Sequence, residues 1–325
     1  MTDPATPMGQ PPSAQNPASV VRLGIPGGRE VTHRDVAANG ARFHIAELGD
    51  GPLVLLLHGF PQFWWTWRHQ LTALADAGFR AVAMDLRGVG GSDRTPRGYD
   101  PAGLALDVTG VIRSLGEPDA ALVGHDLGGY LAWTAAAMRP KLVRRLAVSS
   151  MPHPRRWRSA MLGDVRQSRA GSYIWGFQRP WIPERQLTAD DGALVGRLLD
   201  DWSGPRQLDE EAVTAYRRAM CIPSTAHCSV EPYRWLVRLA RPSGRHPVLP
   251  PHETAGAGAD AAPARLAGPG AAHPERGRFR AVRRSALPLA AVRRARALPA
   301  RRGPGHFFHR TDQLAEGPRT RPVTE

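Results

Sequence analysis

Cysteine, lysine and long hydrophobic runs are scarce in this chain. Its 325 residues contain 2 cysteines, Cys221 and Cys228, whose spacing matches no metal motif and is typical of reduced thiols in the cytosol. Lys141 is the single lysine beside 42 arginines. No stretch approaches the roughly 18 apolar residues of a membrane helix. The 12 histidines form no ligand cluster, so we expect a cytoplasmic protein with no metal and no cofactor.

The length and the hydrophobic pattern predict an α/β protein. A chain of 325 residues can hold one large α/β domain and a small helical one. Strand-like runs alternate with helical patterns, which favours a mostly parallel sheet; these runs are 53–57, 80–84, 120–123 and 146–149. Residues 1–25 begin with a stretch rich in Pro, Ser, Gln and Ala and lack a signal-peptide core. We expect them to form a disordered leader.

An aspartate occupies the centre of a motif that usually carries serine. Residues 124–129 read GHDLGG, after a short apolar run and before a helical pattern that ends at Pro140. In the G-x-S-x-G elbow, a sharp strand-to-helix turn exposes the central side chain as a nucleophile. A carboxylate at this position can attack an sp3 carbon and form an alkyl ester, which water then cleaves. Asp126 is therefore the candidate nucleophile; a turn residue bonded to its own backbone is the alternative.

A second motif follows the apolar run at 53–57. The run suggests a strand buried on both faces, and HGFP at 58–61 comes after it, where open α/β sheets place their ligands. The backbone N–H groups of Phe60 and Leu127 are the candidate oxyanion donors during ester hydrolysis. We expect His58 to shape this turn by a structural hydrogen bond.

Together these motifs resemble the α/β-hydrolase-fold epoxide hydrolases. The segments HGFPQFWWTWR at 58–68 and MDLRGVGGS at 84–92, with the elbow at Asp126, have the order and spacing of that family. The resemblance runs from about residue 31 to residue 239. It implies an α/β-hydrolase fold with a core over 26–150 and a helical cap over 151–240, inserted after the sixth strand.

The resemblance also implies two cap tyrosines that bond the epoxide oxygen and protonate it as the ring opens. Tyr173 lies four residues before Phe177 in a Phe-Gln-x-Pro segment, and Tyr233 opens a Tyr-Arg pair, as in the family. A phenol with a pKa of about 10 stays protonated at neutral pH and can donate. The alternative is a half-buried ring with an anchored hydroxyl, and Tyr216 is the main competitor.

The implied reaction opens an epoxide to a vicinal diol through an ester on the nucleophile. The expected partners are a small hydrophobic epoxide and water, with no nucleic acid and no membrane; the oligomeric state is open. Trp64 and Trp175 are candidates to line an apolar substrate pocket between the cap and the core.

Two other functions stay open. Haloalkane dehalogenases resemble the chain at the elbow but have a tryptophan after the aspartate, where this chain has Leu127. Many epoxide hydrolases also have tryptophan there, so Leu127 departs from both patterns. A small-molecule-binding homologue without turnover is the second alternative.

The base and the acid of the triad are difficult to find. GPGHF at 303–307 resembles the family's histidine segment, so His306 is the candidate base in a C-terminal remnant, 303–325. The acid is unknown: Asp260 and Glu275 are weak substitutes, and residues 149–153, after the sixth predicted strand, contain no carboxylate. The activity of this chain is therefore open.

Residues 241–302 change character. These 62 residues contain 13 arginines and 3 acids, a net charge of 13 − 3 = +10 out of +14 for the chain. Arg, Ala, Pro and Gly dominate, and so few large apolar residues cannot form the last strands of the fold. Three interpretations compete: an Arg-rich tail that binds nucleic acid or an anionic membrane, a disordered linker, and a shifted reading frame in a G+C-rich gene, which we favour.

Overall fold

The structure is a computed structural model that describes residues 23–203 and 208–240. The predictions for 241–302 and 303–325, and for Asp260, Glu275 and His306, lie outside these residues. So does most of the leader expected over 1–25. Its last residues were predicted wrongly as disordered, because Ile25 is buried and the Trp65 indole N–H donates to the Gly24 carbonyl.

Six strands form one mixed sheet in the order β1-β2-β4-β3-β5-β6. Strands β3 to β6 are mutually parallel, whereas β2 is antiparallel to both β1 and β4. All five residues of β3 are buried, as its continuous apolar sequence predicts for a strand covered on both faces. The strands are β1 (Thr32–Ala38), β2 (Ala41–Leu48), β3 (Leu53–Leu57), β4 (Arg80–Met84), β5 (Ala120–His125) and β6 (Val143–Ser149).

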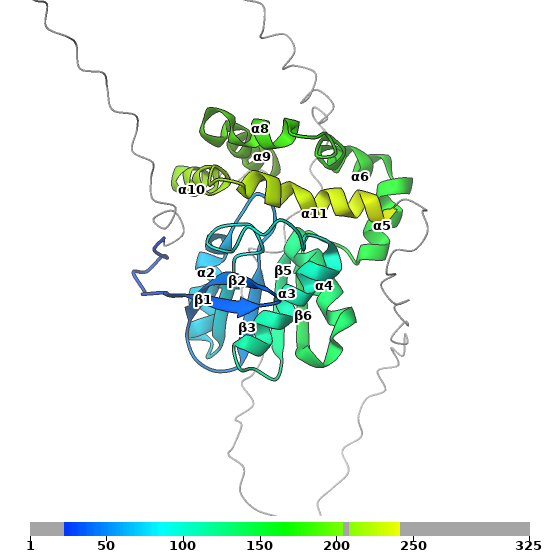
Figure 1. The fold of residues 1–325 in the computed structure, drawn as a ribbon. Coiled ribbons are helices and arrows are strands. Elements are labelled where there is room, and N and C mark those ends of the chain that lie inside the picture. The colour runs from blue at the N-terminus through cyan, green and yellow to red at the C-terminus, as the bar shows by residue number, and fades with distance from the viewer. Residues whose placement is uncertain (1–22, 204–207, 241–325) are drawn as a thin grey trace, which may run out of the picture. The chain divides into compact units, whose positions relative to one another are not determined.

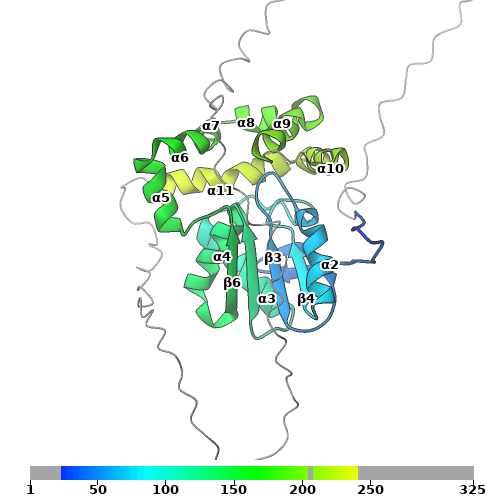
Figure 2. The same cartoon turned by 180° about the vertical axis from the view of Figure 1, so that it is seen from behind.

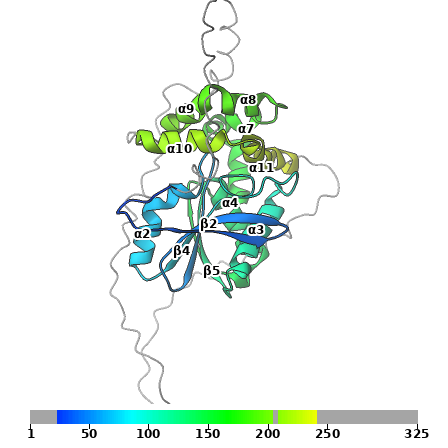
Figure 3. The ribbon, with the colours of Figure 1, turned by 60° about the vertical axis from the view of Figure 1, so that its left-hand side comes forward.

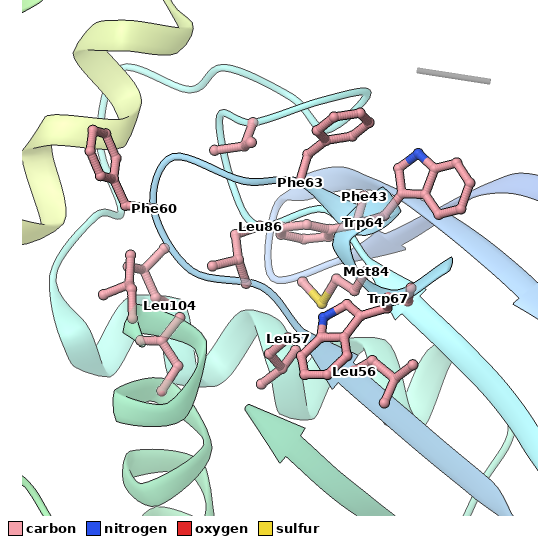
Figure 4. Close-up of a cluster of buried hydrophobic side chains, with 14 of the residues drawn as sticks. Phe43, Leu56, Leu57, Phe60, Phe63, Trp64, Trp67, Met84, Leu86 and Leu104 are labelled. Atoms are coloured by element: carbon pink, nitrogen blue, oxygen red, sulfur yellow. The ribbon is translucent and has the colours of Figure 1, made fainter. Parts of the chain in front are cut away.

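Helices cover both faces of the sheet. Helix α2 (Arg68–Asp76) lies on one face, and α3 (Pro101–Ser114) and α4 (Leu127–Met138) lie on the other (Figure 3). Short 3₁₀ turns span Trp64–Trp67 and Pro140–Leu142. The buried core is rich in aromatic side chains, with Phe43, Trp64 and Trp67 among them (Figure 4). This confirms the predicted α/β-hydrolase type of fold, with a mostly parallel sheet.

The described residues after β6 are largely helical, and we call residues 154–203 and 208–240 the cap. It lies over one end of the strands (Figures 1 and 2). None of the helices in the described ranges is long and apolar enough to cross a membrane. The cap comprises α5 (Pro154–Gly163), α6 (Val165–Ala170), α7 (Ser172–Gly176), α8 (Ile182–Thr188), a 3₁₀ turn (Ala189–Gly192), α9 (Ala193–Trp202), α10 (Glu210–Met220) and α11 (Thr225–Ala240).

Candidate active site

Asp126 lies at a sharp bend between β5 and α4. Its backbone has φ 49° and ψ −119°, a positive φ that non-glycine residues rarely adopt and that is often found at functional sites. A Cβ atom at Gly128 would lie 2.2 Å from the Leu57 carbonyl oxygen, and one at Gly124 would lie 2.4 Å from the Gly128 oxygen. Only glycine fits at these two positions, so the sequence pattern builds the bend predicted for an elbow.

Two groups donate hydrogen bonds to one oxygen of the Asp126 carboxylate. The Phe60 backbone N–H lies 3.1 Å from Oδ2, and the Tyr233 hydroxyl lies 3.2 Å from the same atom. The turn after β3 approaches closely because residue 59 is glycine: a Cβ there would lie 2.6 Å from the Asp126 Cβ atom. The core and the cap therefore meet at this carboxylate.

The two tyrosines predicted from the sequence lie side by side. Their ring centroids are 5.9 Å apart in an edge-to-face arrangement, and Tyr233 is 3% exposed. Burial and the nearby negative charge of Asp126 raise the pKa of both phenols well above the usual value of 10.0. Both hydroxyls are therefore protonated at neutral pH.

Tyr216, the competing tyrosine, lies elsewhere. It is 1% exposed on α10 and packs edge-to-face against Phe63 and Trp65, with centroids 5.8 and 6.5 Å away. Burial raises the pKa of its phenol, and the nearby Thr66 and Arg68 oppose that shift. The geometry therefore favours Tyr173 over Tyr216 as the second proton donor.

His58 makes structural contacts beside the site. Its Nε2 atom accepts from the Leu86 N–H at 3.0 Å, and its Nδ1 atom lies 2.9 Å from the Gly59 carbonyl oxygen. Burial lowers the pKa of His58 below 6.5, so the ring is neutral at pH 7. Both ring nitrogens are engaged, which agrees with the structural role expected for this residue.

A cavity of about 140 Å³ opens beside the Asp126 carboxylate, between the core and the cap. Leu127, the second expected oxyanion residue, follows Asp126 and lines the cavity. The walls are mostly apolar, and the polar side chains among them include the two tyrosines and Gln167. The other lining residues are Tyr130, Ser150, Met151, Pro152, Trp157, Ala170, Gly171, Ile174 and Leu236.

The two tryptophans expected in the pocket do not line this cavity. Trp64 is 0% exposed, its backbone N–H donates to Asp85 at 2.7 Å, and its ring packs against His33. Trp175 is 57% exposed, because Tyr173 and Ile174 occupy the inner face of the short helix α7. The prediction of these two residues at the cavity is therefore wrong.

Other lining residues were not predicted individually. Trp157 packs edge-to-face on Tyr130, with centroids 6.3 Å apart, and so joins the cap to α4. Tyr130 could have been found, since residues four apart share one face of a helix and it lies four residues after Asp126. The lining residues of α5 and α6 could not, because many of their neighbours are exposed arginines that give no inward pattern.

Comparison with known proteins identifies the fold family. Residues 52–213 match the family model for the alpha/beta hydrolase fold. The AB hydrolase superfamily protein YfhM of Bacillus subtilis is 35% identical over 206 residues, which are 62% of this chain and 72% of that protein. Epoxide hydrolase 3 of Xenopus tropicalis is 42% identical over 50% of this chain, but only 45% of that protein is covered.

Solved structures of similar proteins include epoxide hydrolases. VrEH1 from Vigna radiata superposes with a TM-score of 0.56 at 31% identity, over 64% of this chain and 72% of that one. The Bacillus megaterium epoxide hydrolase, solved with an inhibitor, gives 0.58 at 29% identity, over 62% and 71%. The chain therefore belongs to the α/β-hydrolase-fold family and is similar to its epoxide hydrolases.

Proposed function

We propose that the protein opens a small hydrophobic epoxide to a vicinal diol through an ester on Asp126. The observation that carries this proposal is the Tyr233 hydroxyl 3.2 Å from the Asp126 carboxylate, at the edge of an apolar cavity. A nucleophile and a proton donor that face the same small space are the two groups that epoxide opening requires.

In the first half-reaction, a carboxylate oxygen of Asp126 attacks an epoxide carbon. The C–O bond of the three-membered ring breaks, and its electron pair stays on the epoxide oxygen. Tyr233 or Tyr173 gives its proton to that oxygen, which leaves a tyrosinate and a hydroxyalkyl ester of Asp126. The high pKa of both phenols keeps the proton in place until the developing alkoxide, a stronger base, takes it.

In the second half-reaction, water attacks the carbonyl carbon of the ester. The oxyanion receives the N–H of Phe60, which already points at the carboxylate, and that of Leu127 in our proposal. The bond to the alcohol then breaks, the diol leaves, and the proton lost by water restores the tyrosine. A base accelerates this step, and His306 stays the sequence-based candidate for it.

Two hydroxyl donors at the nucleophile favour an epoxide over a haloalkane. A departing alkoxide needs a proton, whereas a departing halide needs only hydrogen-bond donors, and an indole N–H directly after the nucleophile is lacking here. Release of chloride from a chloroalkane at the rate of diol formation would instead support the dehalogenase alternative.

A single-turnover experiment in heavy-oxygen water tests the proposal. The protein is mixed with less than one equivalent of styrene oxide, quenched and digested. We expect the label in the Asp126 peptide and not in the diol, because water attacks the aspartyl carbonyl. Label in the diol alone would rule out the ester mechanism. Asp126→Asn is the matched control, in which neither adduct nor diol should form.

The same experiment separates a catalyst from a binding protein. An ester on Asp126 that accumulates without clearing indicates that only the first half-reaction operates in this chain. Saturable binding of the epoxide with no ester formed would favour the non-catalytic alternative.

A further inference from the structure

The space around the nucleophile is unequal on its two sides. The cavity extends from Asp126 toward Tyr130 and Met151 of the core and toward Trp157 and Ile174 of the cap. Its volume of about 140 Å³ is close to that of an apolar cavity known to hold one benzene molecule, about 150 Å³. One aryl group or one short alkyl chain therefore fills it.

Aromatic rings occupy the other side. Phe60 and Phe177 are 6% and 3% exposed, with ring centroids 5.4 Å apart, and both rings pack edge-to-face on Tyr233 at 5.8 and 5.5 Å. Trp202 extends this group, with its ring 6.3 Å from Phe60 and 5.2 Å from Tyr173. The Phe60 ring points toward α11, away from the core cluster around Trp64 (Figure 4). We call Phe60, Phe177 and Trp202 the aromatic wall.

None of the three wall residues is among those that line the cavity in the described part of the chain. Phe60 nevertheless flanks the nucleophile directly, because its N–H donates to Asp126 Oδ2 at 3.1 Å. The carboxylate and the tyrosine pair thus have the cavity on one side and the three rings on the other, of which Phe60 and Phe177 are buried and Trp202 is 42% exposed.

Because the two sides differ, the geometry of ring opening restricts which epoxides fit the site. The attacking oxygen and the departing oxygen lie on opposite sides of the attacked carbon, so the three-membered ring must enter between Asp126 and the tyrosine hydroxyls and replace the hydrogen bond that joins Tyr233 to Asp126 in the free protein. The carbon substituents then project sideways. A terminal epoxide or a cis-1,2-disubstituted epoxide can direct all of them into the cavity. A trans-1,2-disubstituted epoxide must direct one of them into the aromatic wall.

We propose that the site selects terminal and cis-1,2-disubstituted epoxides with one small aryl or alkyl group and disfavours the trans isomers. This inference rests on the proposed function, since it concerns the ester-forming step at Asp126. A close-packed interior resists an extra methyl group because side chains and backbone must shift to admit it.

The test compares the cis and trans isomers of β-methylstyrene oxide. They have the same formula and differ only in whether the methyl and phenyl groups lie on the same face of the epoxide ring or on opposite faces. The rate of ester formation on Asp126 is measured by quenched-flow mass spectrometry of the full-length protein. We expect the trans isomer to react at least about 10-fold more slowly than the cis isomer. This is the effect of one methylene group that does not fit a pocket. Equal rates for the two isomers would overturn the inference.

Substitutions in the wall give the second arm. Phe177→Ala and the less buried Trp202→Ala each remove a ring from the wall, so the trans isomer should gain in rate relative to the cis isomer. Trp157→Ala is the matched control, because it enlarges the cavity side and should favour larger terminal substituents without helping the trans isomer. Folding of each variant is checked by circular dichroism.

The outcomes separate the two proposals. If neither styrene oxide nor either isomer modifies Asp126, the proposed function fails. If styrene oxide reacts but folded Phe177→Ala and Trp202→Ala both keep the original isomer ratio, the aromatic wall does not select the substrate and only the present inference fails.

Discussion

At the scale of single residues, the tyrosine pair beside Asp126 determines the pH dependence that we expect of the proposed reaction. Burial raises the pKa of Tyr173 and Tyr233, and the negative charge of the Asp126 carboxylate adds to that effect. Each phenol therefore keeps its proton above pH 10, where an exposed tyrosine has lost about half of its protons. A proton donor with a raised pKa is active at neutral pH and loses activity only as pH rises through that value.

We therefore expect the rate of ester formation to stay level between pH 7 and pH 10, apart from any loss of folded protein. Tyr233→Phe should slow the step by about 100-fold, the usual contribution of a positioned acid. Rapid-quench mass spectrometry across this pH range gives the measurement. Tyr216→Phe should react like the original protein, and an equal loss in that control would remove the special role of Tyr233.

At the scale of secondary-structure elements, Arg234 joins the helices that carry the two tyrosines. From α11, its Nε atom donates to the Phe177 carbonyl at 2.9 Å, just after α7, and a terminal nitrogen donates to Glu184 of α8 at 2.7 Å. Burial opposes the charge of Glu184, but the hydrogen bonds from Arg234, from its own backbone N–H and from His227, together with the charge of Arg234, outweigh it and lower the carboxyl pKa. Gln178 adds a bond to the Tyr233 carbonyl at 3.4 Å.

Removing this link should misplace the hydroxyls without removing them. For Glu184→Gln we expect the maximal rate of ester formation to fall, by up to about 100-fold if a hydroxyl moves by 1 Å, while the concentration for half-maximal rate changes little. Saturation kinetics with styrene oxide give both values. Arg238→Gln is the matched control, since Arg238 is half exposed and lies 3.6 Å from Glu231. A change in apparent affinity alone would contradict a positioning role.

The sequence predicts secondary-structure elements well where the hydrophobic pattern is clear. The runs at 53–57 and 80–84 coincide with β3 and β4, because a short, mostly apolar run of this length between turn residues favours a buried strand. The hairpin of β1 and β2 was not predicted, although Asn39 and Gly40 at its turn both have positive φ and Asn-Gly is a strong hairpin signal. Trp64 and Trp175 were placed wrongly because residue type alone does not tell which face a side chain takes.

At the scale of the whole described molecule, the cap and the core are joined by several different contacts. The Tyr99 hydroxyl donates to the Cys228 sulfur at 3.0 Å, Arg94 donates to Thr225 at 3.0 Å, and Arg68 pairs with Asp209 at 3.3 Å. Thr225 and Cys228 belong to α11 and Asp209 caps α10, and Tyr233 of α11 adds the hydrogen bond to the Asp126 carboxylate. Motion of the cap away from the core would therefore break many of them together.

We expect the cap and the core to unfold in one cooperative transition. Circular dichroism and tryptophan fluorescence should give the same midpoint in urea, since tryptophans lie in both parts. An earlier fluorescence change, with most of the helical signal retained, would show instead that the cap opens by itself. A mimic of the ester intermediate, bound between the two parts, should move the common midpoint upward.

Helix α4 has a thermodynamic consequence for the chemistry at its start. Asp126 immediately precedes this 12-residue helix, whose first amide groups carry partial positive charge. In the proposed reaction, alkylation of Asp126 would cancel the anion there and lose an attraction of about 0.3–1 kcal/mol. The helix dipole would therefore shift the equilibrium between the ester and the regenerated carboxylate toward the carboxylate by about two- to five-fold, and so favour release of the diol.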